Sequence, residues 1–340
     1  MRRAYLPPLF GIALLAALPA GAQTLYEEEP AASMDIRVQL WRQLASYADS
    51  LKPVVDDSSP AAYARSIEVL RTRYSAWIGY PAPGFDLKDP HQRMVKIGDD
   101  DVAVYYRCYT PVAEGLEAYG LYIVPKNAAK PAPLVISMHG GGGTPELATF
   151  KGGTNYHDMV RGAVAQGYVV YAPLNIQYPY GDRDKGTPIP EDVLQRFGDQ
   201  FEAAGTSLAA VESAKISRAL DLLVARPEID KTRIGMVGLS MGGEQTVVSA
   251  ALDPRIKVAV CSGSASLHPA TLICPRALQV QMGDKDPFLG RMIDRVKADS
   301  ERIHKLYQKL GIGERFELQI FDGVHEFNGK LAWDFLKKYL

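Results

Sequence analysis

The residues with the clearest chemical signature are a serine flanked by glycines. They form the run Gly238-Leu239-Ser240-Met241-Gly242-Gly243, which follows a predicted strand and precedes a predicted helix. This context is typical of a nucleophile elbow, a strained turn that presents a serine hydroxyl above a sheet. Such a turn leaves almost no room for side chains two residues before and after the serine. Gly238 and Gly242 meet that demand, so we expect Ser240 to be a nucleophile. A glycine-rich turn with an incidental serine is the alternative.

A second run, His139-Gly140-Gly141-Gly142-Gly143, also follows a predicted strand. Glycines allow bare backbone N–H groups to approach an oxygen that becomes negative during acyl transfer. We therefore expect an oxyanion hole made by the N–H of Gly141 or Gly142 together with that of Met241, the residue after the serine. A phosphate loop is excluded because no Gly-Lys-Ser/Thr follows, and the dinucleotide-binding spacing is not met. His139 is expected to support this loop.

A serine nucleophile needs a base to take its proton. We expect this base to be His325, in the run 322–327, because a loop between the last strand and the last helix can reach the elbow. The other histidines are less suitable. His91 precedes the sheet, and His157 begins a helix. His268, in a loop after a strand, is a distant rival. His304 lies on a helix.

The base in turn needs an orienting acid. The run 283–287, Gly-Asp-Lys-Asp-Pro, follows a predicted strand and supplies two carboxylates. Asp286 lies further into the loop, with a proline behind it that stiffens the turn, and is the preferred acid. Asp284 is expected to cap the turn, and Asp322, close in sequence to the base, is the third candidate.

These residues must be positioned by strands that alternate with helices. Such alternation predicts a mostly parallel sheet covered on both faces, hence an α/β fold with an N-terminal helical extension. Residues 23–34 are expected to be irregular, and 174–204 to be a long loop. Helices are expected over 35–50, 61–78, 156–165, 208–225, 244–251, 294–310 and 329–339. Strands are expected over 102–109, 120–124, 134–138, 168–172, 234–237, 256–260, 278–282 and 316–320.

The chain order Ser240, Asp286, His325 resembles that of the α/β-hydrolase superfamily. The resemblance covers about residues 95–340. Within the superfamily, the chain is similar to secreted bacterial members akin to acetyl xylan esterases and dienelactone hydrolases. The runs 233–243 and 283–286 carry it. It implies an α/β-hydrolase fold, and in such relatives the acid falls three residues after the glycine, which favours Asp286. Dienelactone hydrolases use a cysteine nucleophile and dehalogenases an aspartate, so a serine here disfavours both chemistries.

The first residues are typical of a secretory signal peptide. Arg2 and Arg3 precede an apolar run over 9–18, and cleavage is expected after Ala22. A membrane anchor is the alternative, but the run is too short to span about 30 Å of hydrocarbon. The predicted domains are thus 1–22, signal peptide; 23–94, helical extension; and 95–340, catalytic domain. We expect a periplasmic or secreted protein without stable membrane insertion.

The composition of the 340 residues is that of a globular protein, with 47% hydrophobic and 23% charged residues. The net charge of −1 lacks the cationic footprint of a nucleic-acid binder. Three cysteines cannot form a disulfide scaffold. Either Cys261 and Cys274 are bonded, or all three thiols are free and buried. Metal-ligand spacings such as HExxH and paired CxxC are absent, so we expect neither metal nor cofactor.

These features predict a secreted serine ester hydrolase that acts through an acyl-enzyme on short-chain or aromatic acyl esters, such as acetyl or feruloyl groups on plant polysaccharides. Tyr178 and Tyr180 could line an aromatic substrate pocket or stack on a sugar ring, or they could belong to an ordinary packed surface loop. Trp77 and Trp333 are expected elsewhere. A prolyl-oligopeptidase-type peptidase without its propeller domain is the alternative enzyme. A binding protein on an inactive hydrolase scaffold is the third interpretation. The sequence leaves the oligomeric state open.

Overall fold

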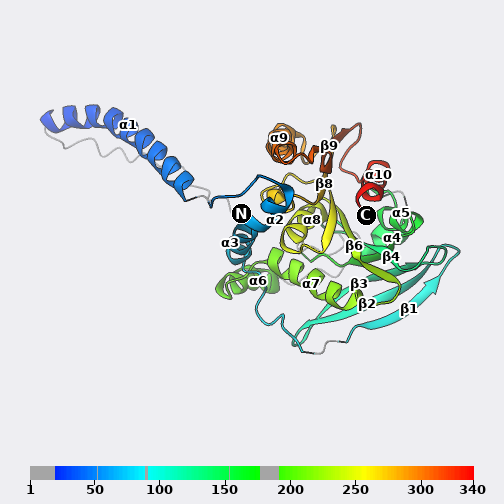
Figure 1. Ribbon diagram of the computed structural model, residues 1–340. Helices are drawn as coiled ribbons and strands as arrows, with labels where there is room; N and C mark the ends of the chain where they lie inside the picture. The colour runs from blue at the N-terminus through cyan, green and yellow to red at the C-terminus, as the bar shows by residue number, and fades with distance from the viewer. Residues whose placement is uncertain (1–19, 52, 89–90, 153, 177–190) are drawn as a thin grey trace. The chain divides into compact units, whose positions relative to one another are not determined.

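The computed structural model describes residues 20–340 except 52, 89–90, 153 and 177–190 (Figure 1). The chain forms two units, Met1–Val54 and Val55–Leu340. The described part of the first unit consists mainly of helix α1 (Ala20–Ser50). The prediction that residues 23–34 are irregular was therefore wrong, because the helix runs through them. The alanines, glutamates and leucine of this segment are good helix formers.

Within the described residues, the second unit is built on one nine-stranded sheet with the order β1-β2-β3-β5-β4-β6-β7-β8-β9. The first three strands are antiparallel, and β3 pairs antiparallel with β5. From β5 to β9 all neighbours are parallel. The strands are β1 (Arg93–Asp99), β2 (Ala103–Ala113), β3 (Leu116–Pro125), β4 (Ala132–Met138), β5 (Val169–Pro173), β6 (Ile229–Leu239), β7 (Ile256–Ser262), β8 (Ala277–Gly283) and β9 (Phe316–Phe321).

Helices cover both faces of the sheet (Figure 1). One core cluster lies beneath α2, α3, α7, α8 and α9, and a second lies beneath α4, α5 and α10. This arrangement confirms the predicted mostly parallel sheet flanked by helices, in which the short strands β4, β5, β7 and β8 are almost wholly buried. The helices are α2 (Pro60–Ser66), α3 (Glu68–Ile78), α4 (Pro145–Phe150), α5 (Met159–Ala165), α6 (Glu191–Ala203), α7 (Leu208–Leu223), α8 (Met241–Leu252), α9 (Ile293–Lys309) and α10 (Gly329–Tyr339), with 3-10 turns at Ala270–Leu272, Gly290–Met292 and Gly313–Arg315.

The structure differs from the expectations in further places. Strand β1 and helix α4 were not predicted. Helix α6 occupies much of the predicted loop 174–204, since its leucine, glutamine, arginine and glutamate residues favour helix. The two compact units of the chain divide after Val54, and α2 and α3, which lie in the predicted extension 23–94, pack on the same core as the sheet.

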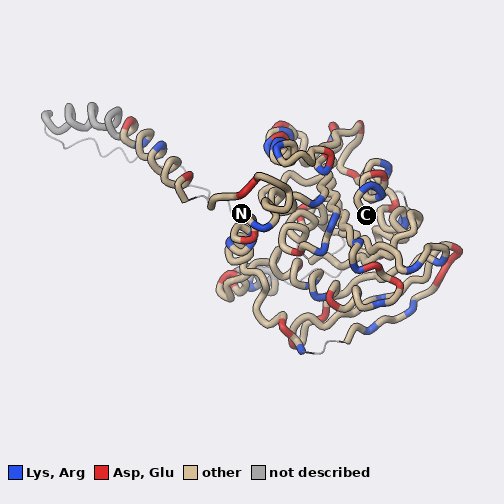
Figure 2. The backbone as a smooth tube through the Cα atoms, in the orientation of Figure 1, with Lys and Arg blue, Asp and Glu red and all other residues tan. Residues whose placement is uncertain are grey.

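The three cysteines are free and buried, which decides the open alternative in favour of unbonded thiols. Burial raises the pKa of Cys108 to about 11 and that of both Cys261 and Cys274 to about 12. Thiols with such pKa values stay protonated and unreactive at neutral pH. Acidic and basic residues are interspersed along the helices and strands (Figure 2). Among the helices that the structure describes, none is long and apolar enough to cross a bilayer.

Candidate active site

Ser240 lies in the turn between β6 and α8, and its backbone has φ 61° and ψ −121°. A non-glycine residue with such angles is strained, and strain of this kind is held in place only by surrounding structure. Here the Ser240 N–H donates to the carbonyl of Ser262 at the end of β7, 2.8 Å away, and the Ser240 carbonyl accepts the first hydrogen bond of α8 from Glu244 at 3.0 Å. The predicted strand-turn-helix context is confirmed.

The two glycines around the serine are required by close backbone approach. A Cβ at Gly238 would lie 2.2 Å from the carbonyl oxygen of Gly242, and a Cβ at Gly242 would lie 2.2 Å from that of Met138 on β4. Neither backbone atom can move without breaking the sheet or the helix start. The elbow is therefore held between two neighbouring parallel strands.

We expect Gly242→Ala to lower the free energy of unfolding by about 3 kcal/mol or more, because overpacking against rigid backbone is costly. Urea unfolding followed by circular dichroism measures this change. Gly290→Ala is the matched control, because a Cβ at Gly290 meets nothing within 4 Å; its stability should stay within about 0.5 kcal/mol of the parent. Equal unfolding midpoints for the two variants would contradict the packing that we describe for the elbow.

Asp286 and His325 form a buried pair, with 2.6 Å between Asp286 Oδ2 and His325 Nδ1. Since a carboxylate can only accept, the Nδ1–H of the ring is the donor. The other carboxylate oxygen, Oδ1, accepts from the backbone N–H groups of Phe288 at 2.8 Å and Leu289 at 3.0 Å. The Asp286 side chain is fully buried and that of His325 is 13% exposed. The pair is therefore rigid, with the Nε2 edge of the imidazole left for another partner.

The other acid candidates do not reach the imidazole. Asp284 accepts from the N–H of Gly323 at 3.2 Å and so ties the β8 loop to the β9 loop. Asp322 is exposed and pairs with Lys285. Both carboxylates thus bind groups at the surface of the loops that carry Asp286 and His325.

The other histidines lie in different surroundings. His157 pairs with Glu326 at 2.7 Å on the surface. His304 contacts the Phe316 ring, and His268 contacts two aromatic rings of α3. His91 is exposed. Of the histidines considered as the base, His325 is the one for which the structure gives a buried acid partner.

The end of β7 brings Ser240 and His325 to the same edge of the sheet. Ser262, which accepts from the Ser240 N–H, also donates its hydroxyl to the carbonyl of Glu326 at 3.1 Å. The next residue, Gly263, lies against the imidazole, since a Cβ there would be 3.0 Å from His325 Cε1. The carboxyl ends of parallel strands β6, β7, β8 and β9 therefore meet around one point, where open α/β sheets bind ligands.

The glycine loop after β4 passes beside the serine. A Cβ at Gly140 would lie 3.1 Å from Ser240 Cβ. The Gly140 N–H donates to the Tyr156 hydroxyl at 3.1 Å, so the following N–H groups, of Gly141 and Gly142, are the candidates for binding an oxyanion. The Met241 N–H is the first of α8, and the first N–H groups of a helix have no intrahelical acceptor. These are the donors that the sequence predicts.

His139 supports this loop, as predicted. Its ring is buried, its Nε2 accepts from the N–H of Asn175 at 2.9 Å, and its Nδ1 lies 2.8 Å from the Gly140 carbonyl oxygen. Burial lowers the pKa of His139 to about 4, with a weaker contribution from the charge of Lys215. The ring is neutral at physiological pH and uses both nitrogens structurally.

Asn175 is itself held from α7. Lys215 donates to the carbonyl of Leu174 at 3.1 Å and to Glu212 Oε1 at 2.7 Å. The same glutamate oxygen accepts from the N–H of Ile176 at 3.4 Å. Burial raises the pKa of Glu212 despite its lysine partner. This buried pair anchors the chain where it leaves β5, and through His139 it braces the glycine loop.

Tyr178 and Tyr180, the predicted substrate-contacting residues, lie outside the described residues. The rim that the structure does describe includes Phe288, which the sequence reasoning missed. Its ring is 74% exposed and packs edge-on against the His325 imidazole, with 5.0 Å between ring centroids. The aromatic residue two positions after Asp286, on the acid loop, was the available signal.

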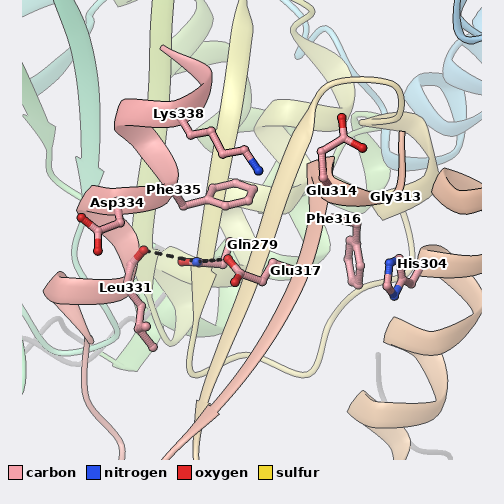
Figure 3. Close-up of a pocket in the computed structure, with 10 residues that line it drawn as sticks. All are labelled: Gln279, His304, Gly313, Glu314, Phe316, Glu317, Leu331, Asp334, Phe335 and Lys338. Atoms are coloured by element: carbon pink, nitrogen blue, oxygen red, sulfur yellow. Dashed lines mark hydrogen bonds between the residues drawn. The ribbon is translucent and has the colours of Figure 1, made fainter. Parts of the chain in front are cut away.

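A cavity of about 530 Å³ lies at the other end of the sheet, toward the amino ends of β8 and β9 (Figure 3). Gln279 crosses it, donating to Glu317 at 2.7 Å and to the carbonyl of Leu331 at 3.3 Å. Its position separates it from Ser240, Asp286 and His325. Within the described residues, no cluster of three or more histidine, cysteine, aspartate or glutamate side chains could hold a metal ion.

Residues 119–332 match the family model of the dienelactone hydrolase family. The chain belongs to the dienelactone hydrolase family. The matched region runs from β3 to α10 and includes the serine elbow, the acid loop and the histidine loop. Membership of this family makes the protein an enzyme, a hydrolase. Its sheet order and flanking helices are those of the α/β-hydrolase fold.

Solved structures support this fold for the family member described here. A putative acetyl xylan esterase from Bacteroides fragilis matches with a TM-score of 0.60 and 15% identity, over 84% of this chain and 85% of that one. A CE15 glucuronoyl esterase from Teredinibacter turnerae matches with a TM-score of 0.60 and 14% identity, over 83% and 86%. A glucuronoyl esterase from Solibacter usitatus matches with a TM-score of 0.56 and 16% identity, over 81% and 93%.

Proposed function

We propose that this hydrolase is a serine carboxylic ester hydrolase with Ser240 as nucleophile, His325 as base and Asp286 as orienting acid. The observation that carries the proposal is the buried Asp286–His325 pair at the same sheet edge as a serine in a strained elbow. A nucleophile, a base and an orienting group in this relation are the parts that acyl transfer requires.

In the first half of the reaction, the Ser240 hydroxyl attacks the ester carbonyl carbon while His325 Nε2 takes its proton. The carbonyl oxygen becomes an oxyanion, which the N–H groups of Met241 and of Gly141 or Gly142 bind; one such donor lowers the barrier by about 3 kcal/mol. Asp286 holds the imidazole and stabilises the imidazolium. The C–O bond then breaks, the proton passes to the leaving alcohol, and an acyl-enzyme forms.

In the second half, water attacks the acyl-enzyme carbonyl and His325 takes a proton from that water. The same N–H groups bind the second oxyanion, and its collapse releases the carboxylic acid and returns the proton to Ser240. The residues of this chain account for both halves without a further group.

For the substrate we propose esters carried by glycans, with acetyl or feruloyl as the acyl group. The support is that acetyl xylan and glucuronoyl esterases are among the proteins that share the fold over more than four fifths of this chain. We also propose export to the periplasm or beyond through residues 1–22, on the signal-peptide pattern of the sequence. No observation of the structure favours a peptidase.

The test is the mature chain from Gln23 assayed on three substrates: p-nitrophenyl acetate, acetylated xylan and the peptidase substrate Gly-Pro-p-nitroanilide. We expect p-nitrophenolate and acetate release from the first two and no p-nitroaniline from the third. Hydrolysis of the anilide without ester hydrolysis would overturn the proposal in favour of a peptidase. Hydrolysis of p-nitrophenyl acetate but of no glycan ester would overturn the proposed substrate class alone.

A further inference from the structure

Three aromatic rings gather outside the set of catalytic residues. Trp77 lies 5.8 Å from Tyr74 and 5.7 Å from His268 between ring centroids, and Tyr74 lies 6.1 Å from His268. We call these three residues the aromatic platform. They line a pocket of about 350 Å³, to which Arg73 and Thr271 also contribute. Trp77 is 67% exposed, so a large apolar ring faces solvent.

The platform lies at the edge of the sheet that carries the catalytic residues. The contacts at the two ends of α3 show that this helix runs toward that edge. Near the start of α3, Arg71 donates to the carbonyl of Ala251, close to the carboxyl end of α8, at 2.8 Å. At the end of α3, the carbonyl of Ile78 accepts from Ser207, the N-cap of α7, at 2.8 Å. Both α7 and α8 begin at the edge where the parallel strands end. Trp77, one residue before Ile78, is thus on that edge.

Two further links connect the platform to the catalytic residues. His268 is on the loop after β7, which starts at Gly263 beside the His325 imidazole. Helix α3, which carries Tyr74, packs against α8, and burial, with a smaller effect of the negative charge of Glu244, raises the pKa of Tyr74 to about 12. Glu244 donates its backbone N–H to the carbonyl of Ser240. The rim therefore continues from Ser240 through Glu244 to the aromatic rings.

The chemistry of the platform matches a sugar ring. A pyranose has faces of C–H bonds and an edge of hydroxyl groups, so it pairs with an exposed aromatic face bordered by hydrogen-bonding side chains. Trp77 supplies the face, while the Arg73 guanidinium and the His268 ring supply polar groups. The pocket volume is at the small end of the range for ligand sites, and its lining is mostly apolar with a few polar groups.

We propose that Tyr74, Trp77 and His268 form a subsite for a sugar ring of the glycan that carries the ester. This inference rests on the proposed function for its substrate class and adds the site that recognises the alcohol part. A short acyl group bound to Ser240 stays at the catalytic centre, and the pocket lined by the platform contains none of the catalytic residues. The group that reaches Trp77 is therefore the saccharide on the leaving side.

The matched variants are Trp77→Ala, Trp77→Phe and Trp41→Ala. Trp41 is the control because its side chain is equally exposed, at 67%, but lies in the separate unit Met1–Val54. On acetylated xylo-oligosaccharides we expect Trp77→Ala to raise KM about 5- to 10-fold with kcat nearly unchanged, the size of one lost aromatic contact. Trp77→Phe should keep most of the affinity. All variants should hydrolyse p-nitrophenyl acetate at the parent rate.

Direct binding separates the subsite from catalysis. Isothermal titration of the full chain with unesterified xylohexaose should show binding in the parent and in Trp41→Ala, and a 5- to 10-fold weaker association in Trp77→Ala, by the same lost contact. Binding without any esterase activity would leave the subsite in place and overturn the proposed function. Ester hydrolysis with no binding of xylohexaose, and equal KM values in parent and Trp77→Ala, would overturn the subsite. A loss in Trp77→Ala that is equal on p-nitrophenyl acetate would also overturn it.

Discussion

Ser240→Ala should reduce the hydrolysis of p-nitrophenyl acetate by about 10⁴- to 10⁶-fold, because no other group can form the acyl-enzyme. The oxyanion donors and the binding surface stay in place in this variant, so a small residual rate above that of water is expected. The measurement is kcat at saturating ester, together with the mass of the parent after treatment with a fluorophosphonate, which should add one adduct at Ser240.

The variant should fold as the parent does, since the strained turn is held by the Ser240 backbone and the neighbouring glycines, not by the hydroxyl. Ser266→Ala is the matched control: Ser266 is another half-buried serine, on the loop after β7. Its rate should be within about twofold of the parent, as expected for a surface change away from the chemistry. Comparable rates for Ser240→Ala and the parent would rule out Ser240 as nucleophile.

Asp286→Asn should lower kcat by about 10³- to 10⁴-fold, through the tautomer of His325. The asparagine oxygen can still accept from the N–H groups of Phe288 and Leu289, which hold the side chain as they hold the aspartate. Its amide nitrogen then faces His325 Nδ1, and two donors cannot share one hydrogen bond. The imidazole must carry its proton on Nε2, where it cannot accept one from the serine.

Asp284→Asn and Asp322→Asn are the controls for this prediction, because both carboxylates lie on the same two loops without touching the imidazole. We expect kcat within about twofold of the parent for each, the usual effect of a surface substitution. Thermal unfolding curves should first show that each of the three variants is folded, and their rates on the ester can then be compared. A large loss in Asp322→Asn with normal activity in Asp286→Asn would transfer the acid role to Asp322.

Most elements of the catalytic unit were predictable from the sequence because their residues act locally. The buried strands are short apolar runs bounded by glycine and proline, and the elbow and acid loops follow strands directly, so periodicity and turn residues were enough. Strand β1 was missed since five of its seven residues are exposed and its pattern follows no clear alternation. Helix α6 was missed because a polar segment after a strand looks like a loop when its partners are unknown.

The candidate catalytic residues could be ranked from chain order, but the acid could not be decided by the residues alone. Asp284, Asp286 and Asp322 are all carboxylates that follow strands of the same edge. The fold distinguishes them, because the backbone N–H groups of Phe288 and Leu289 turn Asp286 inward while Lys285 and Gly323 hold the other two at the surface.

The short-range features of this protein, its glycine-bounded serine, its strands and the order of its catalytic groups, follow from residue types at fixed spacing along the chain. The residues at the rim of the site cannot be inferred from such spacing. Trp77 lies far before Ser240 in the sequence, on a helix outside the sheet. No local pattern therefore links the two residues. They come to one edge only because α3 packs along α8 and a loop from β7 returns past His325. Contacts between distant segments are selected by packing of the whole core, and that information exists only in three dimensions.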